Sequence, residues 1–600
     1  MGDYGLLSDC RSAALVSRDG SIDWFCAPRF DSPSVFARIL DPGGGQWSIR
    51  PASGFFKERA YLGDGPVLRT VFDASGGTVA LTDAMLLSPE GRGHEIGRSA
   101  PHAIAREVAC TAGAVEMVAE LTPRFEYGLT RPTVSGRGED WTLSAGPTVL
   151  RLAGSVPHEI ADGPCLRARF TLRAGESAGF TLHHTAAHDA DSAAIGPPAA
   201  AIQQTIDGWR SWARLHEPYR GRYAGQVRRS AMVLQALTYQ PSGAVIAAPT
   251  TSLPERVGES WNWDYRFVWL RDLSFVLRAL WVAACPDEPR RFFEWIAGSL
   301  GQFDHDRVQI MFGVEGERDL TEHALHHLAG HRGSRPVRVG NDAWRQRQLD
   351  VLGEVLDGAH LLRDRLGELP DPVRGMLIGL ADRAAEGWQQ PDYGMWEARD
   401  RTRHYLSSKV MCWVALDRAV KLAAQLGAEG RVGSWTAARD SVRSAILERG
   451  WDPKVRAFTG AFDSGQLDAS VLLMPLVGFL PATDARVRGT IDRVSERLAS
   501  DHGVQRWEGE GSGFVLCGFW LSECLALAGD ADGAAERFES TAAAANDLGL
   551  LAEETDLESG ELLGNHPQAL SHVGLINSAW RLTQLDQTER STADDRPIDR

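Results

Sequence analysis

The feature that most constrains this chain is a change in the period of its apolar residues near residue 200. Up to about residue 190, apolar and polar residues alternate in short runs separated by turn residues, as in SAALVSRDGSIDWFC with its Asp19-Gly20 pair. Alternation with a period of two is typical of strands that bury one face, and Asp-Gly is a common hairpin turn. Repeated hairpins of this kind predict an antiparallel β-sandwich over residues 1–200.

From about residue 223, the apolar residues recur with the period of a helix. Strongly apolar segments such as DASVLLMPLVGF tend to alternate with amphipathic ones, and a helix that is apolar all round must be buried. Helices that alternate between inner and outer positions predict a closed ring of six hairpins over residues 223–586. We expect a helical linker over 201–222 and a polar, frayed tail over 587–600. The helical segments begin near residues 223, 272, 288, 345, 371, 407, 430, 468, 483, 513, 531 and 568.

Charge and composition restrict the class of partner. The chain carries 63 basic and 79 acidic residues, a formal net charge of −16. This charge argues against nucleic acid, whose phosphates favour a basic face, and it suits a neutral small carbohydrate. No signal-peptide pattern and no apolar run of roughly 18 residues is present, so we expect no membrane segment. The eight cysteines include no CxxC pair, which predicts reduced thiols and a cytoplasmic protein. Whether the chain forms a homo-oligomer stays open.

The stretch WNWDYRFVWLRD, residues 261–272, places an aromatic residue at every second position. In an extended segment these rings share one face, and the polar residues between them share the other. One interpretation is a half-buried strand whose rings face the core. The other is the wall of a sugar site, because a pyranose presents C–H groups to aromatic rings. In that case Arg271 and Asp272 can form charge-assisted hydrogen bonds to the sugar hydroxyl groups.

Two glutamates stand in settings that suit acid–base chemistry. Glu397 follows Trp396 in PDYGMWEARD, and an apolar neighbour disfavours the anion of a carboxyl group, which suits a general acid. Glu553 lies in GLLAEETD, in the connection before the last helix, where functional residues tend to gather. Either residue alone is more simply explained as a helix cap or a solvated side chain. Together they supply the two carboxyl groups that cleavage of a glycosidic bond requires.

Several blocks follow one another along nearly the whole chain: APTTSLPE, WNWDYRFVWLRD, QIMFGVEGERDLTE, GSRPVRVGN, MWEARDRTRHYLSSKVMCWVALDRA and LLAEETDLESGELLGNHPQALSHVGLIN. Together they resemble glycoside hydrolase family 15, which contains glucoamylase-like enzymes and bacterial α,α-trehalases. The N-terminal block GDYGLLSDCRSAALVSRDGSIDWFC resembles the bacterial members. The resemblance implies an N-terminal β-sandwich, a helical linker and an (α/α)6 barrel, and hydrolysis with inversion of configuration.

The resemblance also implies residue roles. Glu397 corresponds to the general acid and Glu553 to the general base, which would stand about 6.5–9.5 Å apart with a water between them. Arg271 and Asp272 correspond to the pair that grips the non-reducing glucose, and Arg506 to a second sugar-binding arginine. No metal or other cofactor is required for this chemistry, and modulation by phosphate or Mg²⁺ stays open. The predicted substrate contacts are Trp263, Asp264, Arg271, Asp272, Trp396 and Arg506.

The first choice of reaction is hydrolysis of α,α-trehalose to two glucoses, because the N-terminal block and the WEARD and LLAEE contexts favour that branch. The runner-up is exo-acting release of glucose from α-1,4 or α-1,6 oligosaccharides. Trp261 stands where the family usually has a basic residue, and this departure bears on the substrate rather than on the catalytic pair. A remoter alternative, from another class, is a non-catalytic carbohydrate-binding protein. The intact pair Glu397 and Glu553 speaks against it.

Overall fold

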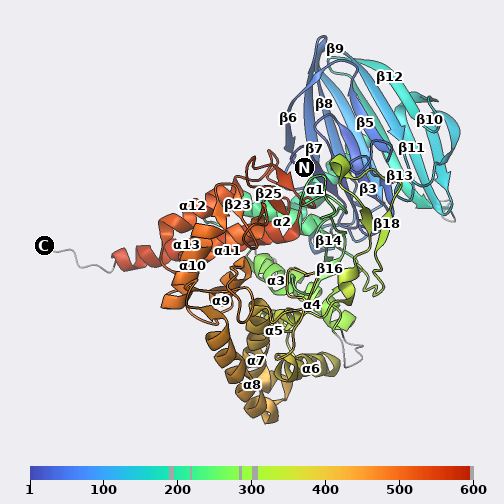
Figure 1. Cartoon of the computed structure of the whole chain (residues 1–600). Coiled ribbons are helices and arrows are strands. Elements are labelled where there is room, and N and C mark those ends of the chain that lie inside the picture. Colours follow the sequence, from blue (N-terminus) through green and yellow to red (C-terminus); the bar gives the residue numbers. More distant parts are fainter. Residues whose placement is uncertain (188–194, 216–218, 283–286, 301–307, 595–600) are drawn as a thin grey trace.

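The two halves of the chain form two domains that lie side by side (Figure 1). The computed structural model describes residues 1–187, 195–215, 219–282, 287–300 and 308–594. A β-domain comes first, helix α1 (Pro198–Ala213) follows it, and a helical domain comes last. This order confirms the predicted fold class, strands before helices. None of the described helices is long and apolar enough to cross a membrane.

The β-domain is an antiparallel sandwich of β1–β13. Its strands are β1 (Gly5–Ser8), β2 (Ala13–Val16), β3 (Ser21–Cys26), β4 (Ser34–Phe36), β5 (Gln46–Pro51), β6 (Phe55–Tyr61), β7 (Leu68–Ala74), β8 (Gly77–Met85), β9 (Ala103–Thr122), β10 (Thr133–Ala145), β11 (Thr148–Ile160), β12 (Leu166–Arg173) and β13 (Ser177–Ala186). The long strand β9 runs through both layers, because its first half pairs with β8 and β13 and its second half with β5 and β12. The hairpin predicted at Asp19-Gly20 joins β2 to β3.

The helical domain is a double ring. Among the described residues it contains α2 (Ala224–Ala236), α3 (Leu273–Val282), α4 (Asp287–Leu300), α5 (Asp350–Leu362), α6 (Asp371–Gly387), α7 (Leu406–Leu426), α8 (Val432–Arg449), α9 (Leu473–Leu476), α10 (Ala485–Arg497), α11 (Val515–Leu527), α12 (Ala531–Ala542) and α13 (Ala569–Asp594). The helices α3, α5, α7, α9, α11 and α13 each contact the next, and α13 returns to α3. This closed inner ring confirms the predicted alternation of inner and outer helices.

Burial explains which helices form the inner ring. The inner helix α11 is buried along almost its whole length, whereas the outer helix α8 buries only Trp435, Val442 and Ile446. A helix that is apolar on every side is stable only when neighbours surround it, so the strongly apolar segments occupy the inner ring. The sequence pattern therefore predicted the position of each layer as well as the number of helices.

Three predicted boundaries differ from the structure. The linker predicted over 201–222 contains a helix, α1, that begins at Pro198 and ends at Ala213. The helix predicted to begin near residue 345 begins at Asp350, because the Leu349 amide donates to Asp392 Oδ2 at 2.9 Å instead of continuing a helix toward the N-terminus. The last helix, α13, runs to Asp594 and so passes the predicted end of the barrel at residue 586. The rest of the predicted polar tail, residues 595–600, lies outside the described residues.

Candidate active site

A cavity of about 610 Å³ opens at one end of the inner ring. Its walls come from segments that lead directly into inner helices: 261–272 into α3, 393–405 into α7, 460–468 into α9, 506–514 into α11 and 553–568 into α13. Since each of these segments precedes an inner helix and all line one cavity, the first residues of these inner helices gather at the same end of the barrel. The predicted residues that line the cavity are Trp263, Arg271, Asp272, Trp396, Glu397, Arg506 and Glu553.

The aromatic stretch forms one wall of this cavity. Residues 261–267 run extended beside 247–255, and backbone hydrogen bonds join the two segments at intervals. Regular pairing is confined to β16 (Val268–Trp269), which pairs with β17 (Met311–Phe312). The rings that line the cavity are Trp261, Trp263, Tyr265 and Trp269. Of the two interpretations of WNWDYRFVWLRD, the structure favours the cavity wall over the core strand.

The polar residues of the same stretch are the more deeply buried ones. Asp264 is 0% exposed and forms an ion pair with Arg266, whose Nη2 lies 2.6 Å from Asp264 Oδ2. Arg266 Nη1 donates to the Ser32 carbonyl of the β-domain at 2.9 Å, and the Gly340 amide donates to Asp264 Oδ2 at 3.0 Å. The prediction that Asp264 contacts substrate is therefore wrong. Its carboxylate instead holds Arg266, which joins the cavity wall to the β-domain.

Glu397 sits in a tight turn between Tyr393 and α7. Its backbone φ is 57°, in the left-handed region, which costs an L residue about 1–2 kcal/mol. Trp269 Nε1 donates to Glu397 Oε1 at 2.6 Å, and Arg271 Nη1 donates to the same oxygen at 3.2 Å. Strain of this kind persists where the surroundings hold a functional side chain in place. The ring that contacts the carboxylate is thus Trp269, from the aromatic stretch.

The chain neighbour of Glu397 has a different task. The Trp396 indole lines the cavity, and its Nε1 donates to Asp468 Oδ1 at 2.9 Å. The Trp396 ring meets Phe514 edge to face, with the ring centroids 5.3 Å apart. Trp396, a predicted substrate contact, therefore lies at the cavity surface. Asp468, which sequence reasoning missed, sets the orientation of its indole.

Arg271 and Asp272 close the aromatic wall at the start of α3. Arg271 Nη1 also donates to the Met395 carbonyl, and Arg271 Nε lies 3.5 Å from Asp272 Oδ1. Burial raises the pKa of Asp272 to about 6, although the positive charge of Arg271 opposes the shift. Arg271 therefore links two carboxyl groups, Asp272 and Glu397, that face the same end of the cavity.

Glu553 comes from the opposite part of the ring. It directly precedes β25 (Glu554–Asp556), which lies between β24 (Ser512–Phe514) and β26 (Leu562–Leu563) in a small sheet. The Val515 amide donates to the Glu553 carbonyl at 3.0 Å. Gly564 has φ +70°, and a Cβ there would lie 2.5 Å from Glu553 Oε2, so the close approach requires glycine. The small sheet and this glycine position the carboxyl group.

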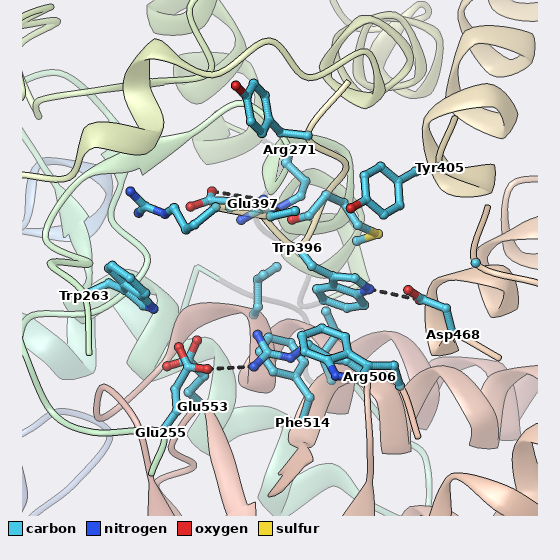
Figure 2. Close-up of a pocket in the computed structure, with 18 of the residues that line it drawn as sticks. Glu255, Trp263, Arg271, Trp396, Glu397, Tyr405, Asp468, Arg506, Phe514 and Glu553 are labelled. Carbon is cyan, nitrogen blue, oxygen red and sulfur yellow. Dashed lines mark hydrogen bonds and ion pairs between the residues drawn. The ribbon is translucent and has the colours of Figure 1, made fainter. Parts of the chain in front are cut away.

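The electrostatic setting of Glu553 is unusual for a carboxyl group. The residue is 1% exposed, and among the described residues none donates a hydrogen bond to its Oε1. Burial raises the pKa of Glu553, and the neighbouring Glu255 carboxylate raises it further. A hydrogen bond with Tyr265 and the charge of Arg506 oppose both effects. Figure 2 shows Glu397 on one side of the cavity and Glu553, beside Glu255, on the other.

Arg506 is held by carboxylates on several sides. Its Nη2 lies 2.6 Å from Glu255 Oε2 and 2.7 Å from Glu554 Oε1, and its Nε donates to Glu510 Oε1. The guanidinium also faces the Phe514 ring, 5.0 Å from its centroid. Arg506 lines the cavity as predicted, but most of its hydrogen-bonding capacity serves this buried network. Among the described residues, no group of His, Cys, Asp and Glu is arranged to hold a metal ion.

Sequence reasoning missed Glu255 and Tyr265 as cavity residues. Glu255 ends the block APTTSLPE, which carried part of the family resemblance. The motif could therefore have pointed to Glu255, but it assigned the residue no role. Tyr265 was seen only as one ring of the alternating stretch. Burial raises the pKa of its hydroxyl well above its usual range, and the charge of Glu553 adds to the shift. Both residues therefore belong to the wall that carries Glu553.

Two carboxyl groups across an aromatic-walled cavity, at the end of a double helical ring, define a glycoside hydrolase. The chain belongs to glycosyl hydrolases family 15, whose family model matches residues 221–580. A second model, trehalase-like N-terminal, matches residues 2–176. The two models together cover both domains, and the described residues that line the cavity all come from the helical domain.

Curated relatives extend over almost the whole chain. A trehalase of Mycolicibacterium smegmatis is 36% identical over 99% of this chain and 92% of its own. A trehalase of Thermoplasma volcanium is 31% identical over 97% of this chain and 93% of its own. Among solved structures, a bacterial glucoamylase complexed with acarbose superimposes with a TM-score of 0.74 and 12% identity, over 98% of this chain and 96% of that one. This last likeness concerns the fold, and it confirms the sandwich followed by an (α/α)6 barrel.

Proposed function

We propose that the protein hydrolyses α,α-trehalose to two glucoses with inversion of configuration. The observation that carries the proposal is the pair of glutamates on opposite walls of one cavity, within a chain similar over both domains to proteins named trehalase. The cavity volume of about 610 Å³ falls in the range of roughly 300–1,000 Å³ typical of small-molecule sites. A small neutral carbohydrate remains the proposed partner of this acidic chain.

In the proposed reaction, Glu397 acts as the general acid. It protonates the glycosidic oxygen through Oε2, because Oε1 is already occupied by Trp269 and Arg271. Protonation makes the leaving sugar a neutral alcohol, so the bond from its oxygen to the anomeric carbon can break. Arg271 and Asp272 would hold the hydroxyl groups of the attacked glucose, and this fixes the ring against Glu397.

Glu553 acts as the general base on the opposite face. It removes a proton from a water molecule, which attacks the anomeric carbon from the side opposite the leaving oxygen. A separation of about 6.5–9.5 Å between the two carboxyl groups leaves room for that water. The reaction as proposed uses these carboxyl groups and water, without a cofactor. We also propose a cytoplasmic protein, which the seven described cysteines, all free thiols, support.

A hydrolysis panel tests the substrate. The purified protein would be incubated with trehalose, maltose, isomaltose, panose and soluble starch, and glucose release would be measured. We expect trehalose to be cleaved with the highest kcat/KM. A preference for maltose, isomaltose or panose would replace trehalose by the runner-up, an exo-acting glucosidase. If none of these substrates released glucose, the proposal that the protein is a hydrolase would be contradicted. Binding of a sugar without turnover would support a carbohydrate-binding protein.

Proton NMR at early times tests the stereochemistry. Inversion at one anomeric carbon of α,α-trehalose produces β-glucose from the attacked ring and α-glucose from the leaving ring. We therefore expect equal amounts of α-glucose and β-glucose at early times, before mutarotation converts them to the equilibrium mixture of anomers. Early release of α-glucose alone would contradict an inverting reaction. The Glu397→Gln variant, incubated in parallel, controls for contaminating activity.

A further inference from the structure

Glu255 is a buried carboxylate at the cavity surface, and the proposed reaction leaves it without a role. Glu255 is 3% exposed and lines the cavity. The Glu255 amide donates to the Trp261 carbonyl at 2.8 Å, so its backbone is paired with the aromatic wall. A nearly buried carboxylate is unfavourable unless a partner compensates its charge, and the identity of that partner indicates what the residue does.

The partner is Arg506, which lies 251 residues away in the chain. Its Nη2 donates to Glu255 Oε2 at 2.6 Å, a short charge-assisted hydrogen bond. Glu510 and Glu554 hold the same guanidinium from other directions. With three carboxylates around it, Arg506 has little freedom to rotate. It therefore fixes the Glu255 carboxylate at one place in the cavity wall.

That place is beside Glu553. Figure 2 shows the Glu255 and Glu553 carboxyl groups next to each other, with a dashed line from Arg506 to Glu255. Of the neighbouring charges, Glu255 raises the pKa of Glu553 most. The other groups around Glu553 are the Tyr265 hydroxyl, the Arg506 cation and the Glu554 carboxyl of β25, with Glu510 behind Arg506. One cation thus faces four carboxyl groups, and like charges this close favour binding of a proton.

We propose that Glu255 is a positioning residue for the general base: anchored by Arg506, it holds a second carboxylate against Glu553 and makes Glu553 a stronger base. This inference rests on the proposed role of Glu553. A base with greater proton affinity removes the proton from water more effectively, but it must first lose its own proton. The acid limb of the pH profile then reports the ionisation of Glu553 and lies closer to neutrality than for an isolated glutamate.

The Glu255→Gln variant tests this role. It removes the negative charge while keeping an acceptor oxygen for Arg506. Without that charge, Glu553 ionises at lower pH, so the acid limb of kcat/KM should move down by about one pH unit or more. The plateau of kcat should fall, because the base is weaker, while KM changes little. A residue that only stabilised the fold would lower activity at every pH without moving the limb.

Glu510→Gln is the matched control, because it also removes one carboxylate from Arg506 but leaves Glu255 in place. We expect a clearly smaller movement of the acid limb. An equal movement in the two variants would assign the effect to Arg506 and overturn the proposal, as would an unmoved limb in Glu255→Gln. If Glu255→Gln fails to fold, Glu255→Asp is the second variant, because it retains the charge on a side chain one methylene shorter. We expect it to move the acid limb part of the way. An unmoved acid limb in Glu255→Asp would also overturn the proposal.

The controls separate this inference from the proposed function. A wild-type protein that releases no glucose, or a Glu553→Gln variant that retains full turnover, would contradict the role of Glu553 itself. An active wild type and an inactive Glu553→Gln, combined with an unmoved acid limb in Glu255→Gln, would contradict only the role of Glu255.

Discussion

The two walls of the cavity carry the same residue type in opposite settings. On one wall, the Glu397 side chain is 14% exposed and its Oε1 accepts from Trp269 and Arg271. On the other, Glu553 is 1% exposed and stands beside a second carboxylate. Trp269 and Arg271 donate to Glu397, whereas Glu553 has a like charge beside it in addition to its hydrogen bond with Tyr265. The difference teaches that environment gives one residue type two opposite electrostatic settings, while the proposed roles of acid and base follow from the family's motifs.

The walls also differ in what supports them. The Glu397 wall depends on the aromatic stretch, which the β-domain fastens through Arg266 and Ser32. The Glu553 wall depends on the small sheet of β24, β25 and β26 within the barrel. A disturbance of the interface between the domains should also reach Glu553, because Tyr265 of the same stretch is hydrogen-bonded to it.

The largest expected effect comes from removing either carboxyl group. Glu397→Gln and Glu553→Gln should each lower kcat on trehalose by a factor of about 10²–10⁴. α-Glucosyl fluoride distinguishes the walls, because fluoride leaves with little need for a proton. With this substrate, Glu397→Gln should recover much of its activity and Glu553→Gln should not. Equal recovery by both variants would break the assignment of acid and base.

The next effect is on stability and concerns the support of the acid wall. Asp264→Asn leaves Arg266 buried without its anionic partner, so the free energy of unfolding should fall by about 3–5 kcal/mol. Denaturant titration measures this loss, and KM for trehalose should stay unchanged in the folded protein. Asp272→Asn is the comparison variant, since Asp272 lines the cavity and its loss should raise KM. A large rise of KM in Asp264→Asn would restore the substrate contact predicted from the sequence.

A smaller effect is expected from Trp269→Phe. This change removes the indole N–H that donates to Glu397 Oε1 while it keeps an aromatic ring. A hydrogen bond to a charged group contributes about 1.5–3 kcal/mol, so kcat should fall roughly 10- to 100-fold. Trp451→Phe, in β20 (Trp451–Asp452) outside the cavity, is the matched control and should keep kcat within about twofold. A similar kcat for both variants would show that Glu397 needs no donor.

The smallest effect is a pH dependence of stability that belongs to the base wall. Burial raises the pKa of Glu554 well above its usual range. Between the unfolded and folded pKa values the folded chain binds the proton and the unfolded chain does not, so stability falls as pH rises through that window. Glu554→Gln should therefore become more stable relative to wild type as the pH rises from 5 to 8. Thermal unfolding at both pH values measures the gain, and a constant difference would contradict it.

Local patterns carried much of the fold and part of the site. The period of two before residue 190 and the helical period after residue 223 each depend only on near neighbours in the chain, so the sandwich and the double ring could be predicted. The resemblance of motifs located Glu397, Glu553, Arg271 and Asp272, and the structure brings all four to one cavity. The beginning of α5 escaped prediction, because the amide of Leu349 is taken by an aspartate 43 residues away.

By itself, the sequence determined that rings and polar groups alternate along WNWDYRFVWLRD, and which residues stand in the family's motifs. Only the tertiary structure decided which face meets the cavity, because a period of two separates two faces without saying what lies against each. For that reason Asp264 was predicted to contact substrate, whereas the structure turns its side chain away from the cavity and pairs it with Arg266, which contacts the β-domain. Likewise, Glu255 acquires its place beside Glu553 only through Arg506, since an ion pair across 251 residues leaves no trace in either local pattern.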